Sequence, residues 1–312
     1  MVDLTGKKTI FLFPGQGVQF PGMGLDLIEK SVEAKKVFDT ASAVLDRDMV
    51  SLVRDSNADT LKRSDISQIS LSAVSLAAAA YLMEQGITPI ACAGFSLGEY
   101  PALACAGVIS LEDCFRLVDA RGKAMQAAVD NIMQKADEPP GMAAIIGLTL
   151  SQVESCIEQW KTAGLEDLYP ANINSSKQVV VSGSASSLVE AEKRFKEAGA
   201  RRVRRLRVAG PFHSPMMKEA ADTFALFIEK IHFNDPSIKI FSNVTGKQIQ
   251  SGEEAKALAL RHIVEPVRWT DEEASFTELE PDALIEADPG NILQGLWRDT
   301  GSAVPCYTME QI

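Results

Sequence analysis

The chain has 312 residues, of which 46% are hydrophobic and 23% charged, and its formal net charge is -11 at pH 7. This length allows one large domain or roughly two smaller ones, and no compositionally biased tract indicates disorder. The net negative charge argues against broad nucleic-acid binding and against adsorption to anionic membranes, because both surfaces repel an anion at long range.

The first predicted element is a short apolar run, Thr9 to Phe13, preceded by polar and charged residues. It resembles neither a secretory signal nor a membrane span, so a cytoplasmic location is expected. Because Pro14-Gly15-Gln16-Gly17 stops the run, it predicts a buried strand that ends in a loop. The five cysteines have no CxxC spacing, which favours reduced thiols over disulfides or metal ligands.

An alanine-rich helical pattern follows, from about Asp65 to Gln85, and ends at Gly86. A second apolar strand is predicted from Ile87 to Ala93. It leads into Gly94-Phe95-Ser96-Leu97-Gly98 and a helix that should end near Gly107. Strand, tight turn and helix in this order indicate an α/β fold.

The Gly-x-Ser-x-Gly pattern at positions 94 to 98 is typical of a nucleophile elbow. Such a turn presents the serine hydroxyl at a helix N-terminus, where backbone N–H groups can stabilise an oxyanion. An ordinary glycine-flanked turn is the alternative, and the pattern alone does not distinguish the two. The predicted strand before Ser96 and the predicted helix after it favour the elbow.

A capping sequence, Ser110 to Asp113, opens a further helix that is predicted to run to about Asp130. One face of this helix carries four apolar residues and one arginine: Cys114, Leu117, Val118, Arg121 and Met125. A guanidinium on an apolar face needs a partner, because an unpaired buried charge is costly. A bidentate carboxylate from a substrate would satisfy Arg121, and so would an internal salt bridge.

The polar, proline-containing stretch from Gln134 to Pro140 predicts a boundary. The elements expected after it are strand 142–146, helix 151–162, strand 168–173, strand 178–182, helix 185–198 and strand 202–208. This β-α-β-β-α-β order is the ferredoxin-like pattern, so an inserted subdomain at residues 138–208 is predicted. Residues 1–137 and 209–312 should form a large α/β-hydrolase-like catalytic subdomain with a parallel sheet, including short strands near 238–241 and 283–285.

A catalytic serine needs a base, and the base is normally a histidine. The chain has three histidines. His213 stands in Gly210-Pro-Phe-His-Ser-Pro215, a loop with restricted backbone on both sides, where a rigidly presented side chain is useful. His232 is expected to be structural, and His262 lies near a helix end. By elimination, His213 is the predicted general base.

The run from Arg201 to Arg207 is the one strongly basic segment of this acidic protein. On a strand, Arg202 and Arg204 face opposite to Arg201 and Arg205, so the charges cannot share one face. The run could dock an acidic partner or a phosphorylated cofactor arm. A solvated edge strand is the alternative.

Together these segments resemble the malonyl-CoA:acyl-carrier-protein transacylase family over nearly the whole chain. The matching stretches are Phe13–Gly17, Gly94–Glu99, Arg121–Gln126, Gly141–Gly147, Asn174 with Gln178–Gly183, Phe212–Pro215, Ser242–Gly246 and Pro266–Trp269. The resemblance implies that Ser96 is the nucleophile and His213 the base. It also implies an oxyanion hole from the backbone N–H groups of Gln16 and Leu97, and Arg121 as the ligand of the malonyl carboxylate.

Two departures from the family pattern concern the site. The family usually has His where this chain has Phe95, which removes a polar group beside the acyl pocket. It commonly has Gln where this chain has His262, at the position whose main-chain carbonyl orients the catalytic histidine. That carbonyl should survive the change. Phe212, before the histidine, resembles the malonyl-selecting version of its loop.

The resemblance implies a ping-pong transfer of malonyl from coenzyme A to the phosphopantetheine thiol of a holo acyl carrier protein, in fatty-acid or polyketide synthesis. The coenzyme A thioester is then a substrate, with no bound metal or redox cofactor. Arg202 and Arg204 are candidates for docking the carrier protein, and neither nucleic acid nor membrane is an expected partner. Two alternatives are an acyl-thioester hydrolase on the same fold and a non-catalytic carrier-protein docking module.

Overall fold

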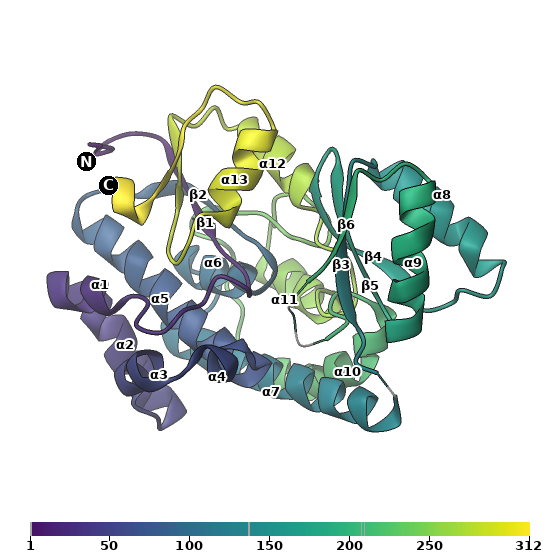
Figure 1. Cartoon of the computed structure of the whole chain (residues 1–312). Helices are drawn as coiled ribbons and strands as arrows, with labels where there is room; N and C mark the ends of the chain where they lie inside the picture. The colour runs from purple at the N-terminus through teal and green to yellow at the C-terminus, as the bar shows by residue number, and fades with distance from the viewer. Residues whose placement is uncertain (1, 137, 207, 209) are drawn as a thin grey trace.

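Two separate β-sheets organise the chain in the computed structural model, which describes residues 2–136, 138–206, 208 and 210–312. The first sheet has the strand order β7-β2-β1-β8-β9 and its neighbouring strands are all parallel. The second has the order β4-β5-β3-β6 and is antiparallel. Figure 1 shows the second sheet, with helices α8 and α9, as a distinct unit beside the rest of the molecule.

The parallel sheet is buried on both faces, as the apolar run at its centre predicts. Its strands are β1 (Thr9–Phe13), β2 (Pro89–Gly94), β7 (Lys239–Ile240), β8 (Ala283–Glu286) and β9 (Cys306–Thr308). On β1, Phe11 and Phe13 join the main core, whereas Ile10 and Leu12 pack into a second cluster around Trp269. The edge strand β9 is not predicted from sequence, because a strand of three residues is too short to show a clear alternation.

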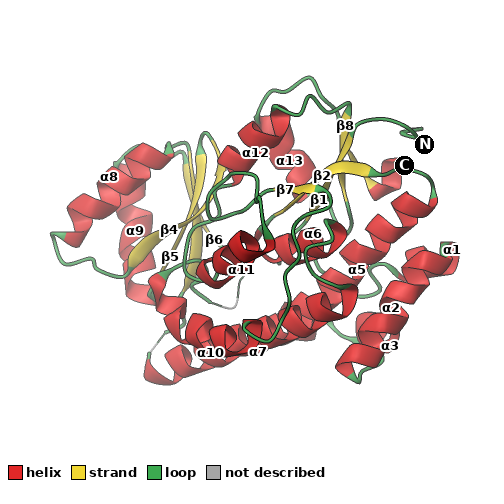
Figure 2. Ribbon diagram, turned by 180° about the vertical axis from the view of Figure 1, so that it is seen from behind, coloured by secondary structure: helices red, strands yellow, loops and turns green. Residues whose placement is uncertain are grey.

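Helices cover both faces of this sheet (Figure 2). They are α1 (Leu25–Lys30), α2 (Val32–Leu45), α3 (Met49–Asp55), α4 (Ala58–Lys62), α5 (Ser64–Glu84), α6 (Glu99–Cys105), α7 (Leu111–Lys135), α10 (Lys218–Ile228), α11 (Gly252–Arg261), α12 (Trp269–Thr277) and α13 (Ile292–Asp299). By length and composition α5 could cross a membrane, but most of it is buried inside this fold as a core helix. Its predicted span is confirmed to within one residue at each end.

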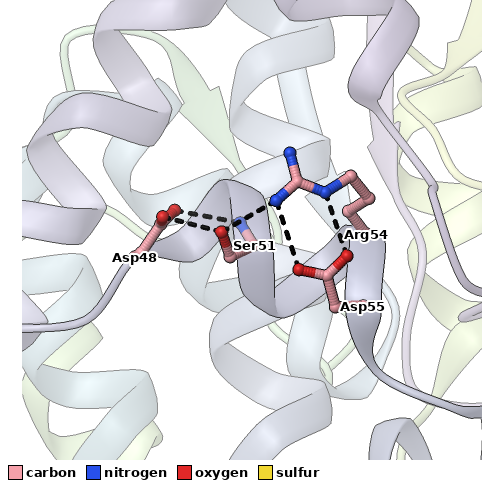
Figure 3. A network of polar contacts seen from close by, with 4 residues as sticks. All are labelled: Asp48, Ser51, Arg54 and Asp55. Atoms are coloured by element: carbon pink, nitrogen blue, oxygen red, sulfur yellow. Dashed lines mark hydrogen bonds and ion pairs between the residues drawn. The ribbon is translucent and has the colours of Figure 1, made fainter.

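Side-chain caps set where several helices begin. Ser110 begins α7 as predicted, by accepting the Asp113 N–H at 3.0 Å. Asp48 caps α3 in the same way, accepting the Ser51 N–H at 2.9 Å and the Ser51 hydroxyl at 2.7 Å (Figure 3). One such cap stabilises a helix by about 1 kcal/mol. The adjoining pair of Arg54 and Asp55 is exposed, so it contributes little more.

The antiparallel unit follows the predicted β-α-β-β-α-β order. It consists of β3 (Gly141–Ile146), α8 (Leu150–Lys161), β4 (Leu168–Ser175), β5 (Gln178–Gly183), α9 (Ala185–Glu197) and β6 (Arg202–Arg205). The two helices pack on one face of the sheet around their own core, in which the rings of Trp160 and Phe195 lie 4.6 Å apart. The other face contributes Met142 and Ala144 to the main core, so it turns towards the parallel-sheet unit.

Two predicted boundaries need correction. Helix α7 extends to Lys135 instead of ending near Asp130, so Gln134 belongs to the helix and not to a linker. Strand β6 ends at Arg205 instead of Val208, since its pairing with β3 stops at the Arg205–Ala143 pair. The proposed subdomain junctions at 137 and 209 fall on residues outside the described part of the chain.

Candidate active site

Ser96 occupies a sharp turn between β2 and the short 3₁₀ segment η1 (Ser96–Gly98) that leads into α6. Its φ is 53°, a left-handed conformation that a non-glycine residue holds only when its surroundings enforce it. Both flanking glycines are required sterically: a Cβ on Gly94 would overlap the Gly98 backbone, and a Cβ on Gly98 would overlap the carbonyl of Phe13. The elbow interpretation of the motif therefore holds over an ordinary turn.

The structure brings His213 to this serine. The Ser96 Oγ lies 2.7 Å from His213 Nε2, and the two residues are 117 positions apart in sequence. On the other side of the ring, His213 Nδ1 lies 3.0 Å from the carbonyl oxygen of His262 and 3.2 Å from that of Glu265. Because carbonyls only accept hydrogen bonds, Nδ1 carries the proton. Nε2 is then the acceptor that faces the serine hydroxyl, as a general base requires.

Burial sets the protonation state of this histidine. Burial, together with the positive charge of Arg121, lowers the pKa of His213 to about 4, although the two carbonyl contacts act in the opposite direction. The imidazole is therefore neutral near pH 7 and able to take a proton. An anion that pairs with Arg121 would remove part of the opposing charge and make the imidazole more basic.

The antiparallel unit holds this histidine from two directions. Ser182 on β5 donates its hydroxyl hydrogen bond to the carbonyl oxygen of Phe212 at 2.5 Å. Beside β4, the Val267 N–H donates to Ala171 O at 2.9 Å, next to the segment that supplies the Glu265 carbonyl. The active site therefore lies where the two sheet units meet.

The loop after β1 lies against the elbow. The Phe95 N–H donates to the Phe13 carbonyl at 2.9 Å, and a Cβ on Gly15 would come within 2.6 Å of the Phe95 carbonyl oxygen. Gln16 follows this contact directly in the chain, and its side chain donates to Ser67 Oγ at 2.6 Å. The two residues predicted to supply the oxyanion hole therefore lie in the loop after β1 (Gln16) and in η1 (Leu97), and these two segments are in contact.

Arg121 is fully buried on the predicted apolar face of α7. Its Nη1 donates to Gln68 Oε1 at 2.9 Å, and its guanidinium carbon lies 5.2 Å from the centroid of the Tyr100 ring. Its Nε and Nη2 have no hydrogen-bond partner, and no carboxylate forms an ion pair with it, among the residues that the structure describes. Burial lowers the pKa of Arg121, because a charge is costly in an apolar environment, whereas the nearby Tyr100 and Glu99 raise it. Within the described part of the chain, the internal salt bridge that the sequence allowed is not formed.

The Phe95 side chain packs against apolar residues. Its ring meets the indole of Trp269 edge to face, with centroids 5.4 Å apart. The residue that departs from the family pattern is therefore part of the apolar cluster on one face of the parallel sheet.

Sequence reasoning missed Asn243, which follows β7 and is fully buried. Its side chain contacts the backbone N–H of Ser96, the imidazole of His262 and the carboxyl group of Glu272. The resemblance included Asn243 in a matching stretch, but no local pattern indicates contacts across 147 positions of sequence. His232, by contrast, is exposed and contacts Asn234, in accord with its expected structural role.

The basic run lies at an edge of the antiparallel sheet. Arg202 and Arg204 on β6 pair with Ile146 and Ala144, and both arginines are exposed. Val203 between them is buried with α8 and α9, so the two arginines project from the face that turns towards the parallel-sheet unit. Arg207 lies outside the described residues.

The chain is similar in sequence and in structure to known proteins. The acyl transferase domain family matches residues 10–310. The malonyl CoA-acyl carrier protein transacylase of Escherichia coli K12 is 37% identical over 287 residues, which cover 92% of this chain and 90% of that protein. The crystal structure of MCAT from Streptococcus pneumoniae superposes with a TM-score of 0.90 at 31% identity, covering 97% of this chain and 96% of the other. A type II PKS acyl-carrier protein in complex with its malonyl-transacylase contains a chain that superposes with a TM-score of 0.87 at 35% identity, covering 96% of this chain and 94% of that one.

Proposed function

Because this chain belongs to the acyl transferase domain family, we propose that it is a malonyl-CoA:acyl-carrier-protein transacylase that carries the malonyl group as an ester on Ser96. The family membership shows an acyltransferase that uses a coenzyme A thioester. We also propose the roles of the individual residues given below, a docking surface for the carrier protein and a cytoplasmic location.

In the first half-reaction, His213 Nε2 takes the proton of the Ser96 hydroxyl as Oγ attacks the thioester carbonyl carbon. The negative charge that develops on the carbonyl oxygen is stabilised by the backbone N–H groups of Gln16 and Leu97. When the tetrahedral intermediate collapses, the carbon–sulfur bond breaks. Coenzyme A leaves with the proton held by His213, and malonyl remains on Ser96.

The second half-reaction reverses these roles. The phosphopantetheine thiol of the carrier protein gives its proton to His213 and attacks the ester carbonyl. The bond to Ser96 Oγ breaks, and His213 returns the proton to the serine. Every proton transfer and every bond change in this scheme takes place between groups of the protein and of its two substrates.

One observation carries the choice of malonyl: the buried Arg121 guanidinium forms no ion pair with a carboxylate among the described residues, and its Nε and Nη2 have no hydrogen-bond partner there. A malonyl group ends in a free carboxylate that could accept from Nε and Nη2 in a bidentate arrangement. An acetyl group would leave the charge unpaired. The substrate would then supply the anion that the apolar face of α7 lacks.

The decisive experiment is intact-mass spectrometry after mixing the protein with malonyl-CoA. We expect a malonyl adduct that is absent from Ser96→Ala and that disappears when holo acyl carrier protein is added, with malonyl appearing on the carrier. Free malonate released at a rate that the carrier does not affect would instead indicate a hydrolase. A wild-type protein without any adduct would indicate a docking module.

A further inference from the structure

We propose that Asn243 is a positioning residue for catalysis, because its amide joins the Ser96 elbow to the residue that orients the catalytic base. The inference rests on the proposed function in that Ser96 is the nucleophile and His213 the base. Among the described residues, Asn243 forms no hydrogen bond with Ser96 Oγ or with His213, so it would act through the two residues that it connects.

The carbonyl oxygen of the Asn243 amide accepts two hydrogen bonds. One comes from the backbone N–H of Ser96 at 2.6 Å, and the other from His262 Nε2 at 3.1 Å. His262 in turn presents its own carbonyl oxygen to His213 Nδ1 at 3.0 Å. A single buried oxygen atom therefore lies between the nucleophile's backbone and the carbonyl that aligns the base.

The contacts of the amide nitrogen determine how the Asn243 side chain is oriented. Its Nδ2 donates to the Gly94 carbonyl at 2.6 Å and to Glu272 Oε1 at 2.7 Å. A carbonyl cannot donate, so the nitrogen must face Gly94 and the oxygen must face Ser96. The same constraint assigns the tautomer of His262: its Nε2 carries the proton and its Nδ1, which is buried without a hydrogen-bond partner among the described residues, does not.

Two buried carboxyl groups hold the asparagine in place. Glu272 accepts from its side chain, and Glu99 accepts from its backbone N–H at 2.7 Å. Burial raises the pKa of Glu99 to about 7 and the pKa of Glu272 well above its usual range. Protonation of Glu272 avoids an unpaired charge beside the amide. The hydrogen bonds to Glu272 and Glu99 together fix the position of Asn243.

The hydrogen bond from the Ser96 N–H to the Asn243 amide oxygen matters because Ser96 has a left-handed backbone conformation. Holding its N–H stabilises a conformation that is otherwise strained, and it aims Oγ at His213. It also occupies the Ser96 N–H, which leaves the N–H of Leu97 as the elbow's donor for the oxyanion. A loss of alignment of about 1 Å can cost roughly 100-fold in rate.

The test measures how fast Ser96 reacts in Asn243→Ala and Asn243→Asp, with malonyl-CoA and, separately, with a fluorophosphonate that needs no malonyl pocket. We expect Asn243→Ala to slow both reactions by about 10- to 100-fold per folded molecule. The malonyl-CoA concentration at half-maximal rate should stay nearly unchanged, because Arg121 is untouched. Asn57→Ala is the matched control: Asn57 also accepts a backbone N–H, from Thr60 at 2.8 Å, but caps α4 away from the site.

The Asn243→Asp variant should add a pH dependence of the rate, which a loss of folded protein alone would not produce. An ionised aspartate would oppose the Gly94 carbonyl, whereas a protonated one could donate a hydrogen bond to it. Its rate relative to wild type should therefore rise as the pH falls from 8 to 6. A pH-independent ratio, or an Asn243→Ala variant as fast as wild type, would overturn the inference.

His262 provides a second comparison that leaves every backbone carbonyl in place. His262→Gln can still donate to the Asn243 oxygen, whereas His262→Leu cannot, so the leucine variant should react several-fold more slowly with the fluorophosphonate than the glutamine variant. Equal rates would remove His262 from the proposed connection. If the wild type reacts with the fluorophosphonate but not with malonyl-CoA, the proposed function fails while the role of Asn243 is still measured.

Discussion

At the scale of single residues, the site consists of groups whose properties are set by burial. Arg121 illustrates this, since it is buried on the apolar face of α7, where desolvation lowers its pKa, and it forms no ion pair with a carboxylate among the described residues. Its charge also contributes to the lowered pKa of His213. If the malonyl carboxylate binds Arg121 as we propose, substrate binding and base strength are coupled through one guanidinium.

This coupling leads to a prediction for Arg121→Ala. The preference for malonyl-CoA over acetyl-CoA in loading Ser96 should fall by about 10- to 100-fold, because hydrogen bonds to a charged group contribute roughly 1.5–3 kcal/mol. Loading rates for the two thioesters, measured by mass spectrometry, provide the ratio. Arg121→Lys keeps the charge but loses the fork and should retain part of the preference. An unchanged ratio in the alanine variant would mean that the malonyl carboxylate binds elsewhere.

At the scale of secondary-structure elements, β6 presents Arg202 and Arg204 of the basic run on the sheet face that turns towards the parallel-sheet unit. The alternation of a strand was predictable from the sequence, and so was the separation of Arg202 and Arg204 from Arg201 and Arg205. The sequence did not predict which face of β6 turns towards the parallel-sheet unit, because that depends on how α8 and α9 pack. The strand's exposed edge also fits a solvated role, so a measurement must decide.

We expect the double reversal Arg202→Glu with Arg204→Glu to raise the carrier-protein concentration needed for half-maximal transfer, most strongly at low salt, since long-range attraction is screened by ions. Loading from malonyl-CoA alone should not change. Arg201→Glu with Arg205→Glu makes the same change in net charge on the other face and serves as control. Equal effects of the two pairs, or none, would favour the solvated edge.

At the scale of the whole molecule, several carboxyl groups are buried in the fold. Burial raises the pKa of Glu99 and Glu286 to about 7 and that of Glu273 to about 8. Such groups bind protons more tightly in the folded chain than in the unfolded one, so folding stability falls as the pH rises through these values. The lowered pKa of His213 acts in the opposite direction, but only between about 4 and 6.5.

The free energy of unfolding should therefore decrease by on the order of 1–3 kcal/mol between pH 6.5 and 8. Urea denaturation at both pH values measures the change. Glu273→Gln, which cannot ionise, should make the dependence shallower. Glu278→Gln replaces an exposed carboxyl at the end of the same helix and should leave it as it is. A stability that rises over this interval would contradict the prediction.

Local patterns in the sequence determined the elements and the chemical groups of this protein. The glycines around Ser96, the cap at Ser110 and the β-α-β-β-α-β order each reflect sterics or periodicity within a few residues, which is why they were predictable. The resemblance of the chain to its family placed Ser96, His213 and Arg121 in one site. Their assigned roles stay predictions until loading is measured.

Only the tertiary structure decided how these groups meet. The second carbonyl at His213, from Glu265, and the amide of Asn243 come from segments that are distant in sequence from the residues they contact. Whether Arg121 has an internal partner likewise depends on every element packed around it. Hydrogen bonds between remote segments follow from the packing of the whole chain, and a local pattern of residue types does not encode that packing.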